Sequence, residues 1–332
     1  MDRKVLVTGG AGFIGSHLCG RLLDEGLRVV SFDNFNPFYD PSIKKRNIAA
    51  LLSRPDRENF ISIEGDIRDS ETLFRVFAHE KPDAVVHLAA MAGVRPSIKD
   101  PVLYTEVNVT GTQNVLEACV EQGIRHLLFA SSSSVYGNNL KVPFSETDPV
   151  DHPISPYAAT KKAGELMCHT YAHLYGMAIY CLRFFTVYGP GQRPDLAIYK
   201  FAKLMLEDAE IPFYGDGATQ RDYTYVEDIV DGIVKALDRN FSEAKKSYHV
   251  LNLGGSQTVT LTQMVETLEQ ALGRRARLKR LPQQPGDVEK TYADISKARD
   301  MLGFSPATPF AEGIRKFAAW YQALRKEEGI AA

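Results

Sequence analysis

The first half of the chain alternates short apolar runs with longer amphipathic segments. Runs rich in β-branched residues, such as KVLVTG at 4–9 and DAVVHLAA at 83–90, have the length and composition of buried strands. Segments with a helical spacing of apolar residues lie between such runs, at 13–25, 42–52, 70–78, 103–122 and 156–175. Strands separated by crossover helices predict a parallel sheet covered on both faces, with a ligand crevice at the carboxyl ends of its strands.

After about residue 185 this alternation weakens, because proline and glycine separate the helical stretches. We expect a smaller mixed α/β lobe there, which covers a substrate. The helical segment 226–239 and the strand-like YHVLNLGG that follows return the chain to the first lobe. The sequence therefore predicts an α/β protein with a doubly wound parallel sheet. Its first domain comprises residues 1–184 and about 226–253, and its second lobe comprises residues 185–225 and 254–332.

The composition argues against several classes of protein. With 332 residues, of which 44% are apolar and 24% are charged, the chain can bury a large core. The sequence suggests neither a signal peptide nor a membrane span, so we expect a cytoplasmic protein without a membrane partner. A formal net charge of -2 argues against nucleic acid as a partner. The four cysteines form no CxxC pair, so we expect reduced thiols and no metal site.

Three glycines, Gly9, Gly12 and Gly15, lie between the first predicted strand and helix. In such a loop they allow a tight turn, let the backbone approach a pyrophosphate, and let helix and strand pack closely. Asp33, at the end of the second strand, would accept hydrogen bonds from ribose hydroxyls and repel a 2′-phosphate. The sequence thus predicts a Rossmann domain that prefers NAD to NADP, with a purely structural turn as the alternative. Two further strand ends would line the cofactor with Asp66, Ile67, Leu88, Ala89 and Ala90.

Tyr157 and Lys161 are four residues apart in a predicted helix that follows a Ser-Pro start signal, so both side chains lie on one helix face. A tyrosine is a weak base, and lowering its pKa to near neutrality needs roughly 4 kcal/mol of phenolate stabilisation. A neighbouring ammonium and the positive charge of a nicotinamide can both contribute. A hydroxyl from the run Ser131–Ser134, at the end of the fifth strand, would share the substrate proton. The alternatives are a chance spacing and a serine-rich turn.

Seven motifs together resemble the extended short-chain dehydrogenase/reductase family of nucleotide-sugar-modifying enzymes: TGGAGFIG, DNFN, GDI, HLAA, SSSSVYG, SPYAATK and RDYTYVED. Within that family, DNFNPFYDPSIKKRNI, AGVRPS and QPGDVEKTYAD resemble the UDP-glucuronate 4-epimerases, with the UDP-glucose 4-epimerases as near relatives. The resemblance implies that Tyr157, as phenolate and with Ser132, takes the proton of the sugar 4-hydroxyl, while Lys161 holds the nicotinamide ribose and lowers the tyrosine pKa. A hydride would pass to tightly held NAD and return to the opposite face of the 4-keto sugar.

The resemblance also assigns binding residues to the two ligands. NAD is expected to contact Gly9, Gly12, Phe13, Ile14, Gly15, Asp33, Asn34, Asp66, Ile67, Leu88, Ala89, Ala90, Asn108, Tyr157 and Lys161. The UDP-sugar is expected to contact Arg95, Ser133, Ser134, Thr186, Arg193, Arg221 and Asp287. Arg221 resembles the arginine that binds the diphosphate. Gln284 stands where glucose epimerases have an arginine, so Arg193 would replace that arginine or approach the sugar carboxylate.

Selectivity would come from Ser133, Ser134 and Thr186. Their neutral hydroxyls can bind a C6 carboxylate, whereas the acidic residues that dehydratase and decarboxylating relatives carry in this neighbourhood would repel it. The sequence thus favours conversion of UDP-glucuronate to UDP-galacturonate. A UDP-glucose 4-epimerase, a decarboxylating lyase and a non-catalytic NAD-binding regulator are the alternatives, and uridine is not distinguished from thymidine. The resemblance implies a homodimer in which the helices at 103–122 and 156–175 form an intersubunit four-helix bundle, where their apolar stripes would be covered.

Overall fold

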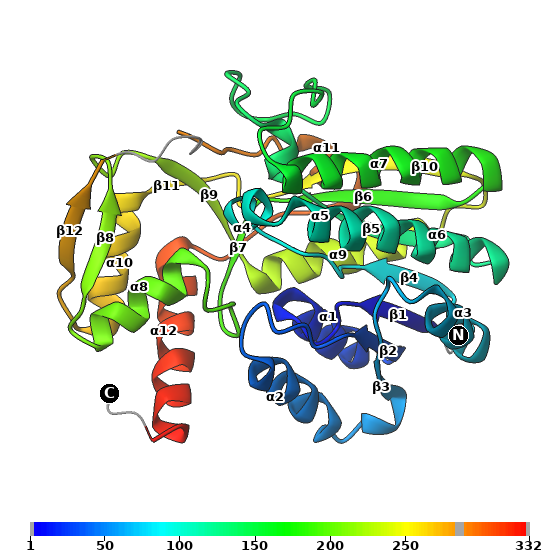
Figure 1. Ribbon diagram of the computed structural model, residues 1–332, viewed down its shortest axis with the longest axis horizontal. Coiled ribbons are helices and arrows are strands. Elements are labelled where there is room, and N and C mark those ends of the chain that lie inside the picture. Colours follow the sequence, from blue (N-terminus) through cyan, green and yellow to red (C-terminus); the bar gives the residue numbers. More distant parts are fainter. Residues whose placement is uncertain (1–2, 283–288, 330–332) are drawn as a thin grey trace.

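A parallel sheet of seven strands is the centre of the computed structural model, which describes residues 3–282 and 289–329 (Figure 1). The strands lie in the order β3-β2-β1-β4-β5-β6-β10. All are short, and the five inner strands are almost wholly buried, as the apolar runs of the sequence predicted, whereas the edge strands β3 and β10 are only partly buried. Their bounds are β1 Lys4–Thr8, β2 Arg28–Asp33, β3 Phe60–Glu64, β4 Ala84–His87, β5 His126–Ser132, β6 Ala178–Phe184 and β10 Ser247–Leu253.

Helices cover both faces of this sheet, which confirms the predicted doubly wound architecture. Apolar side chains pack against one face from α1 (Phe13–Asp24), α2 (Pro41–Leu52) and α9 (Val226–Phe241). The opposite face is covered by α3 (Ser70–Glu80), α6 (Gly111–Glu121) and α7 (Pro156–Tyr175). Short elements connect the layers: η1 Arg57–Asn59, α4 Val94–Lys99, α5 Pro101–Thr105, η3 Ser133–Tyr136 and α11 Ser296–Leu302.

The segment 103–122, predicted as one continuous helix, is divided in the structure. It consists of α5, a π-helical turn at η2 (Glu106–Thr110) and α6. In the turn, Asn108 bonds to the backbone of Met91 on the neighbouring loop and to Thr160 of α7. Apolar periodicity cannot distinguish such a turn from a regular helix, because the apolar residues on both sides of it still face the core.

The smaller mixed α/β lobe lies beside the carboxyl ends of the large sheet. Its strands are β7 Thr186–Tyr188, β9 Gln220–Tyr225 and β11 Thr258–Thr260 in one sheet, and β8 Glu210–Tyr214 and β12 Arg277–Leu281 in another. Figure 1 shows these strands on the left together with α8 (Ala197–Leu206), α10 (Leu261–Leu272) and α12 (Phe310–Glu327). The domain boundaries given above stay a prediction. Within the described ranges, the helices are too short or too polar to span a bilayer.

The strand order reverses between β1 and β4, which makes their carboxyl ends the expected place for a ligand crevice. Both strand ends are fixed by backbone hydrogen bonds: the amide of Gly9 donates to Phe32 at 2.7 Å, and the amide of Leu88 donates to Thr8 at 3.1 Å. Gly9 adopts a positive φ of 73°, and a Cβ there would lie 2.8 Å from the amide nitrogen of Ala89. The chain can therefore turn sharply at this point only with glycine.

Candidate active site

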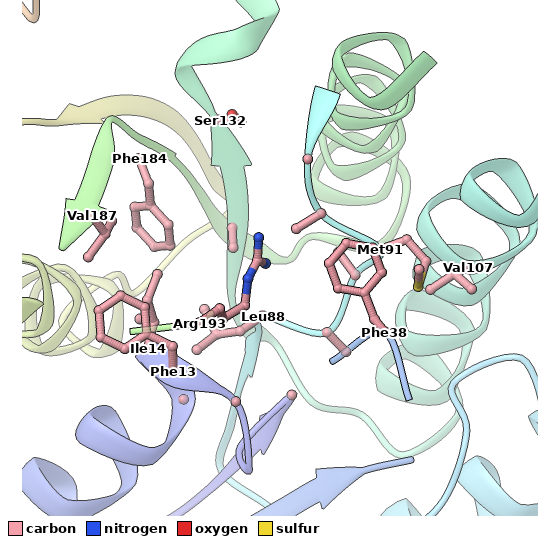
Figure 2. A pocket seen from close by; sticks show the side chains of 18 of the residues that line it. Phe13, Ile14, Phe38, Leu88, Met91, Val107, Ser132, Phe184, Val187 and Arg193 are labelled. Carbon is pink, nitrogen blue, oxygen red and sulfur yellow. The ribbon is translucent and has the colours of Figure 1, made fainter. Parts of the chain in front are cut away.

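A cavity of about 390 Å³ opens at the carboxyl ends of β1, β2, β4 and β5, a volume typical of small-molecule sites. It brings together the glycine loop, the end of β2, the serine run and the Tyr157–Lys161 helix, segments that lie far apart in the sequence. Figure 2 shows Arg193 pointing into the cavity, with Phe38 on one side, Ile14 and Phe184 on the other, and Ser132 at the end of its strand. Two of the predicted functions, dinucleotide binding and proton transfer, therefore share one space.

The glycine loop fits a dinucleotide. Gly12 is the N-cap of α1, where it has no side chain to cap the helix, so the first amides can face a phosphate. Gly9, Gly12 and Gly15 all line the cavity. A Cβ on Gly15 would lie 2.1 Å from the carbonyl oxygen of Gly9, so the loop and helix approach each other as closely as their backbones allow. These are the properties that a pyrophosphate-binding loop requires.

A Gly15→Ala substitution is expected to lower stability by about 1–3 kcal/mol, because the added methyl group overpacks the junction of loop and helix. The same variant should copurify with less dinucleotide. Thermal unfolding and the dinucleotide released on denaturation measure the two effects. Gly20→Ala in the same helix is the matched control, since its Cβ would have its nearest neighbour at 3.7 Å. Equal thermal stability and equal dinucleotide content of the Gly15→Ala and Gly20→Ala variants would contradict the close approach of the loop to the helix.

The end of β2 presents Asp33 to the cavity. Its carboxylate is buried and accepts hydrogen bonds from the amides of Phe35 at 2.8 Å and Ala11 at 3.3 Å. Asn34 also lines the cavity and donates to Asp66 at 2.9 Å. Burial opposes ionisation of Asp66, but hydrogen bonds from Arg68 and Asn34 prevail and lower its pKa to about 2. The end of the cavity at β2 therefore presents one carboxylate in a fixed orientation, that of Asp33, and Asp66 holds the neighbouring Asn34.

Tyr157, Lys161 and Ser132 meet where β5 ends beside the first turns of α7. Ser155 caps this helix by accepting from the amide of Ala158, which places Tyr157 in the first turn. The hydroxyls of Tyr157 and Ser132 are hydrogen-bonded. The Lys161 ammonium donates to the carbonyl of Ala130 at 2.8 Å and lies 6.0 Å from the centre of the Tyr157 ring. Strand β5 and helix α7 therefore hold all three groups of the predicted proton-transfer set.

Burial and the polar neighbours of Tyr157 act in opposite directions on its ionisation. Burial raises the pKa of Tyr157, although the hydrogen bond with Ser132 and the charge of Arg193 act in the opposite direction. Burial also lowers the pKa of Lys161 to about 8. Desolvation of the phenolate outweighs these favourable interactions, so a tyrosine pKa lowered by Lys161 together with a nicotinamide charge stays a prediction. A phenolate at neutral pH requires further positive charge beside the ring.

A buried ion pair lies directly behind the serine run. Glu165, one turn beyond Lys161 on α7, accepts from Arg183 of β6 at 2.8 and 2.9 Å and from the hydroxyl of Ser131 at 2.6 Å. Both charged side chains are almost fully buried. Burial favours the neutral carboxyl, but the contacts with Arg183 outweigh it and lower the pKa of Glu165. The pair ties β5, β6 and α7 together at the edge of the cavity.

The charges around the cavity favour an anionic ligand. Among the described residues that line it, Lys44, Lys161 and Arg193 are cationic and only Asp33 is acidic. Asp195 accepts from the guanidinium of Arg193 at 2.9 and 3.0 Å and thereby orients it. Neutral hydroxyls complete the polar lining at Ser133, Ser134 and Thr186. The structure thus brings Arg193 and the three predicted selectivity residues to one cavity, together with most of the predicted NAD contacts: Phe13, Ile14, Ile67, Leu88, Ala89 and Ala90.

Four predicted contact residues lie outside the cavity lining, and a fifth lies outside the described residues. Asn108 is buried in the π-helical turn, where it holds the loop after β4. Asp66 adjoins the cavity through its neighbours Gly65 and Ile67. Arg95 lies in α4 and Arg221 on β9, both outside the cavity lining among the described residues. Asp287, like Gln284, lies outside the described residues. The backbone of Gln220 pairs with Glu289 and Thr291, so β9 brings Arg221 beside the segment that follows Asp287.

Sequence reasoning missed several residues of the cavity. Lys44 lies in the predicted helix 42–52 and was not assigned to the site, although its side chain is buried against Asp33, eleven positions earlier in the chain. The aromatic residues Phe38, Tyr39, Phe184 and Phe185 form much of the apolar lining. The motif DNFNPFYD could have indicated the first two, because several aromatic residues in a loop just after the ribose acid suggest that the loop lines a binding site. Phe184 is the last residue of the apolar strand β6 and Phe185 follows it directly, so apolar periodicity did not distinguish them from core residues.

Comparison with known proteins agrees with this geometry. The family model described as GDP-mannose 4,6 dehydratase matches residues 6–317. A protein of Rhizobium meliloti named probable UDP-glucuronate 4-epimerase is 41% identical, with 96% of each chain covered. UDP-glucuronate 4-epimerase 3 of Arabidopsis thaliana is 44% identical over 96% of this chain and 76% of the plant protein.

Among solved structures, the chain is similar to the UDP-glucuronic acid 4-epimerase of Bacillus cereus, crystallised in complex with UDP-glucuronic acid and NAD. The TM-score is 0.88 at 37% sequence identity, and the match covers 97% of this chain and 99% of that chain. A full-length match at this identity extends beyond the fold to the family. The chain therefore belongs to the short-chain dehydrogenase/reductase family of nucleotide-sugar enzymes that the GDP-mannose 4,6-dehydratase model describes, and it is similar there to UDP-glucuronate 4-epimerases.

Proposed function

We propose that the chain is an NAD-dependent isomerase that inverts C4 of UDP-glucuronate to give UDP-galacturonate through a transient 4-keto intermediate. The observation that carries this proposal is the meeting of Ser132, Tyr157 and Lys161 with the glycine loop in one cavity. The similarity to UDP-glucuronate 4-epimerases over nearly the whole chain supports the same activity. The family resemblance and the chemistry of the cavity thus lead to one reaction.

The cofactor is NAD, which supplies a hydride acceptor and donor and, when oxidised, a positive charge beside the phenol. The glycine loop would hold its pyrophosphate and Asp33 its adenosine ribose. Lys161 would hold the nicotinamide ribose, since its ammonium is already fixed against Ala130 at the correct strand end. Asn34 and the backbone from Leu88 to Ala90 would line the remainder of the dinucleotide.

Tyr157 would take the proton of the 4-hydroxyl, and Ser132 would share it through the hydrogen bond between the two side chains. On the return step the same pair would restore the proton to the 4-keto oxygen. The apolar walls formed by Phe38, Met91 and Phe184 keep water from the reacting carbon. Such walls make few directional contacts, so the sugar can turn its other face to the cofactor while the diphosphate stays anchored.

Selectivity for the acidic sugar would come from the cationic and neutral polar lining. Arg193 offers positive charge, and Ser133 and Thr186 offer hydroxyl donors without adding negative charge. A lyase that removes the carboxylate is less well supported, because Asp33 is the only acidic side chain among the described lining residues and it lies at the end of β2. The neutral lining therefore favours retention of the carboxylate.

Ser133→Asp is expected to reduce kcat/KM for UDP-glucuronate by at least about tenfold, since like charges brought together in a binding site cost several kcal/mol. The value for UDP-glucose should fall much less, because that sugar carries no carboxylate. Ser133→Ala, which removes the hydroxyl without adding charge, is the matched control. Steady-state kinetics on both sugars measure the effect, and equal losses on the two sugars would contradict the assigned role.

The activity itself is tested by incubating the purified protein with UDP-glucuronate and UDP-glucose separately, without added NAD, and following the anomeric proton signals by NMR. Formation of UDP-galacturonate from UDP-glucuronate alone is the expected result. Conversion of UDP-glucose alone would overturn the carboxylate assignment, and release of carbon dioxide would indicate the lyase. Dinucleotide recovered from the denatured protein checks that NAD is carried through purification.

We also propose that the chain acts as a homodimer, as predicted above, and in the cytoplasm. Support for the dimer comes from apolar side chains on the outer face of α7 and the adjoining helices, where Leu166, Leu174 and Val102 are more than half exposed. An exposed apolar patch of this kind is typical of an interface between subunits. Sedimentation velocity at micromolar concentration tests the proposal, and a monomer under those conditions would contradict it.

A further inference from the structure

Lys44 of α2 is buried beside Asp33, at the end of the cavity nearest to β2. Its ammonium lies 3.1 Å from Oδ1 of Asp33 and 5.6 Å from the centre of the Tyr39 ring. The side chains of Lys44 and Asp33 are 11% and 5% exposed. Lysine is seldom buried to this degree unless it is paired. Both partners line the cavity, so the pair belongs to the binding site and not to the core beneath it.

The two carboxylate oxygens of Asp33 have different surroundings. Oδ1 accepts from the amide of Phe35 at 2.8 Å and from Lys44 at 3.1 Å, whereas Oδ2 accepts from the amide of Ala11 at 3.3 Å. Oδ2 therefore retains the greater capacity to accept a hydrogen bond from a ligand. Lys44 and Phe35 fix the carboxylate in the orientation that exposes this oxygen.

The pairing changes the electrostatic account of cofactor choice. A lone carboxylate would repel a 2′-phosphate by its charge, but Asp33 and Lys44 together carry no net charge. The cavity already contains a cation that could bind a 2′-phosphate, the ammonium of Lys44, but this ammonium is paired with Asp33. Dinucleotide sites that accept NADP place a cationic side chain at this position relative to the ribose.

We propose that Lys44 is a second determinant of cofactor choice: Asp33 binds the ribose hydroxyls and at the same time keeps the Lys44 ammonium from a ribose 2′-phosphate. Loss of the carboxylate uncovers Lys44 as a phosphate-binding cation. Loss of Lys44 leaves the charge of Asp33 unbalanced and strengthens discrimination against NADP. This inference rests on the proposed use of the cavity as a dinucleotide site, and it is independent of which sugar the enzyme converts.

The test compares the dissociation constants of NADH and NADPH on protein stripped of its own dinucleotide, measured by fluorescence. In Asp33→Ser the ratio of the NADPH constant to the NADH constant should fall by about tenfold to 100-fold, the range of one charge-assisted hydrogen bond. Serine can still accept from the amide of Phe35, which preserves the turn. In the double variant Asp33→Ser/Lys44→Met most of that fall should disappear. An equal fall in both variants would overturn the proposal, because Lys44 would then take no part.

Lys44→Met alone provides a second test that leaves Asp33 in place. The same ratio should rise, while Lys45→Met, which changes the exposed neighbour in the same helix, should leave it unchanged. If the unmodified protein epimerises UDP-glucuronate but Lys44→Met leaves the ratio of the NADPH constant to the NADH constant unchanged, this inference is overturned and the proposed function is not. Failure of the wild-type protein to bind either dinucleotide would overturn the proposed function and this inference with it.

Discussion

Tyr157→Phe is expected to lower kcat for epimerisation by about 10³-fold, within the range that positioned acid–base groups contribute. The hydroxyl of Tyr157 bonds with Ser132 in the cavity, and phenylalanine keeps the ring but cannot exchange a proton with the 4-hydroxyl. Bound NAD should stay near the wild-type amount, since the substitution removes only one oxygen atom. Steady-state kinetics and the dinucleotide released on denaturation measure the two quantities.

Tyr104→Phe is the matched control for this experiment. The Tyr104 ring packs edge-to-face on Tyr157 with centroids 6.2 Å apart, and its hydroxyl donates to the carbonyl of Ala92. Its removal costs one hydrogen bond in the wall of the site, with about 1 kcal/mol of stability, and no proton-transfer group. Activity of Tyr157→Phe within tenfold of the control would contradict the assignment of Tyr157 as the base.

Glu165→Gln is expected to destabilise the protein by about 3–5 kcal/mol, the cost of breaking a buried ion pair by removing one partner. The guanidinium of Arg183 would stay buried without its counter-charge, because both side chains are at most 2% exposed. The loss should also loosen Ser131, whose hydroxyl donates to Glu165 beside the reactive Ser132. Chemical denaturation followed by circular dichroism measures the free energy of unfolding.

Lys162→Gln serves as the control for Glu165→Gln. Lys162 lies 3.5 Å from the same carboxylate but is 22% exposed, so its loss should cost less than about 1 kcal/mol. A double variant, Glu165→Leu/Arg183→Met, should recover part of the stability, since an apolar pair can replace a buried ion pair. A Glu165→Gln variant as stable as the Lys162 control would show that Arg183 finds compensation elsewhere.

The strands and helices of the large sheet could be predicted because each buries a face whose period is visible in the sequence. The strand β1 and the glycines that follow it also predicted the phosphate loop, since only glycine permits the positive φ at Gly9 and the approach of Gly15 to its carbonyl. Ser132, Tyr157 and Lys161 could be predicted as a group because α7 is the first long helix after β5, with only the short η3 between them. Local sequence thus determines those parts of the site that a single loop or helix turn builds.

Parts of the site built by distant segments could not be predicted from periodicity. Lys44 stands in the run KKR, which is typical of an exposed helix, and only the structure shows that the first of these lysines turns inward to Asp33. The burial that raises the pKa of Tyr157 could not be predicted either, because it depends on how completely the fold removes the phenol from water. Strands β7, β9 and β11 were not predicted individually, since each is short and lies among proline and glycine.

The central claim is that a hydride leaves C4 of the sugar and returns to the same carbon from the opposite side. UDP-glucuronate carrying deuterium at C4, converted by the wild-type protein in ordinary water, tests it most directly. The account predicts UDP-galacturonate that retains its deuterium at C4, with no solvent proton at that carbon, as NMR and mass spectrometry will show. Product carrying a proton at C4, with the deuterium lost to the solvent, would contradict it.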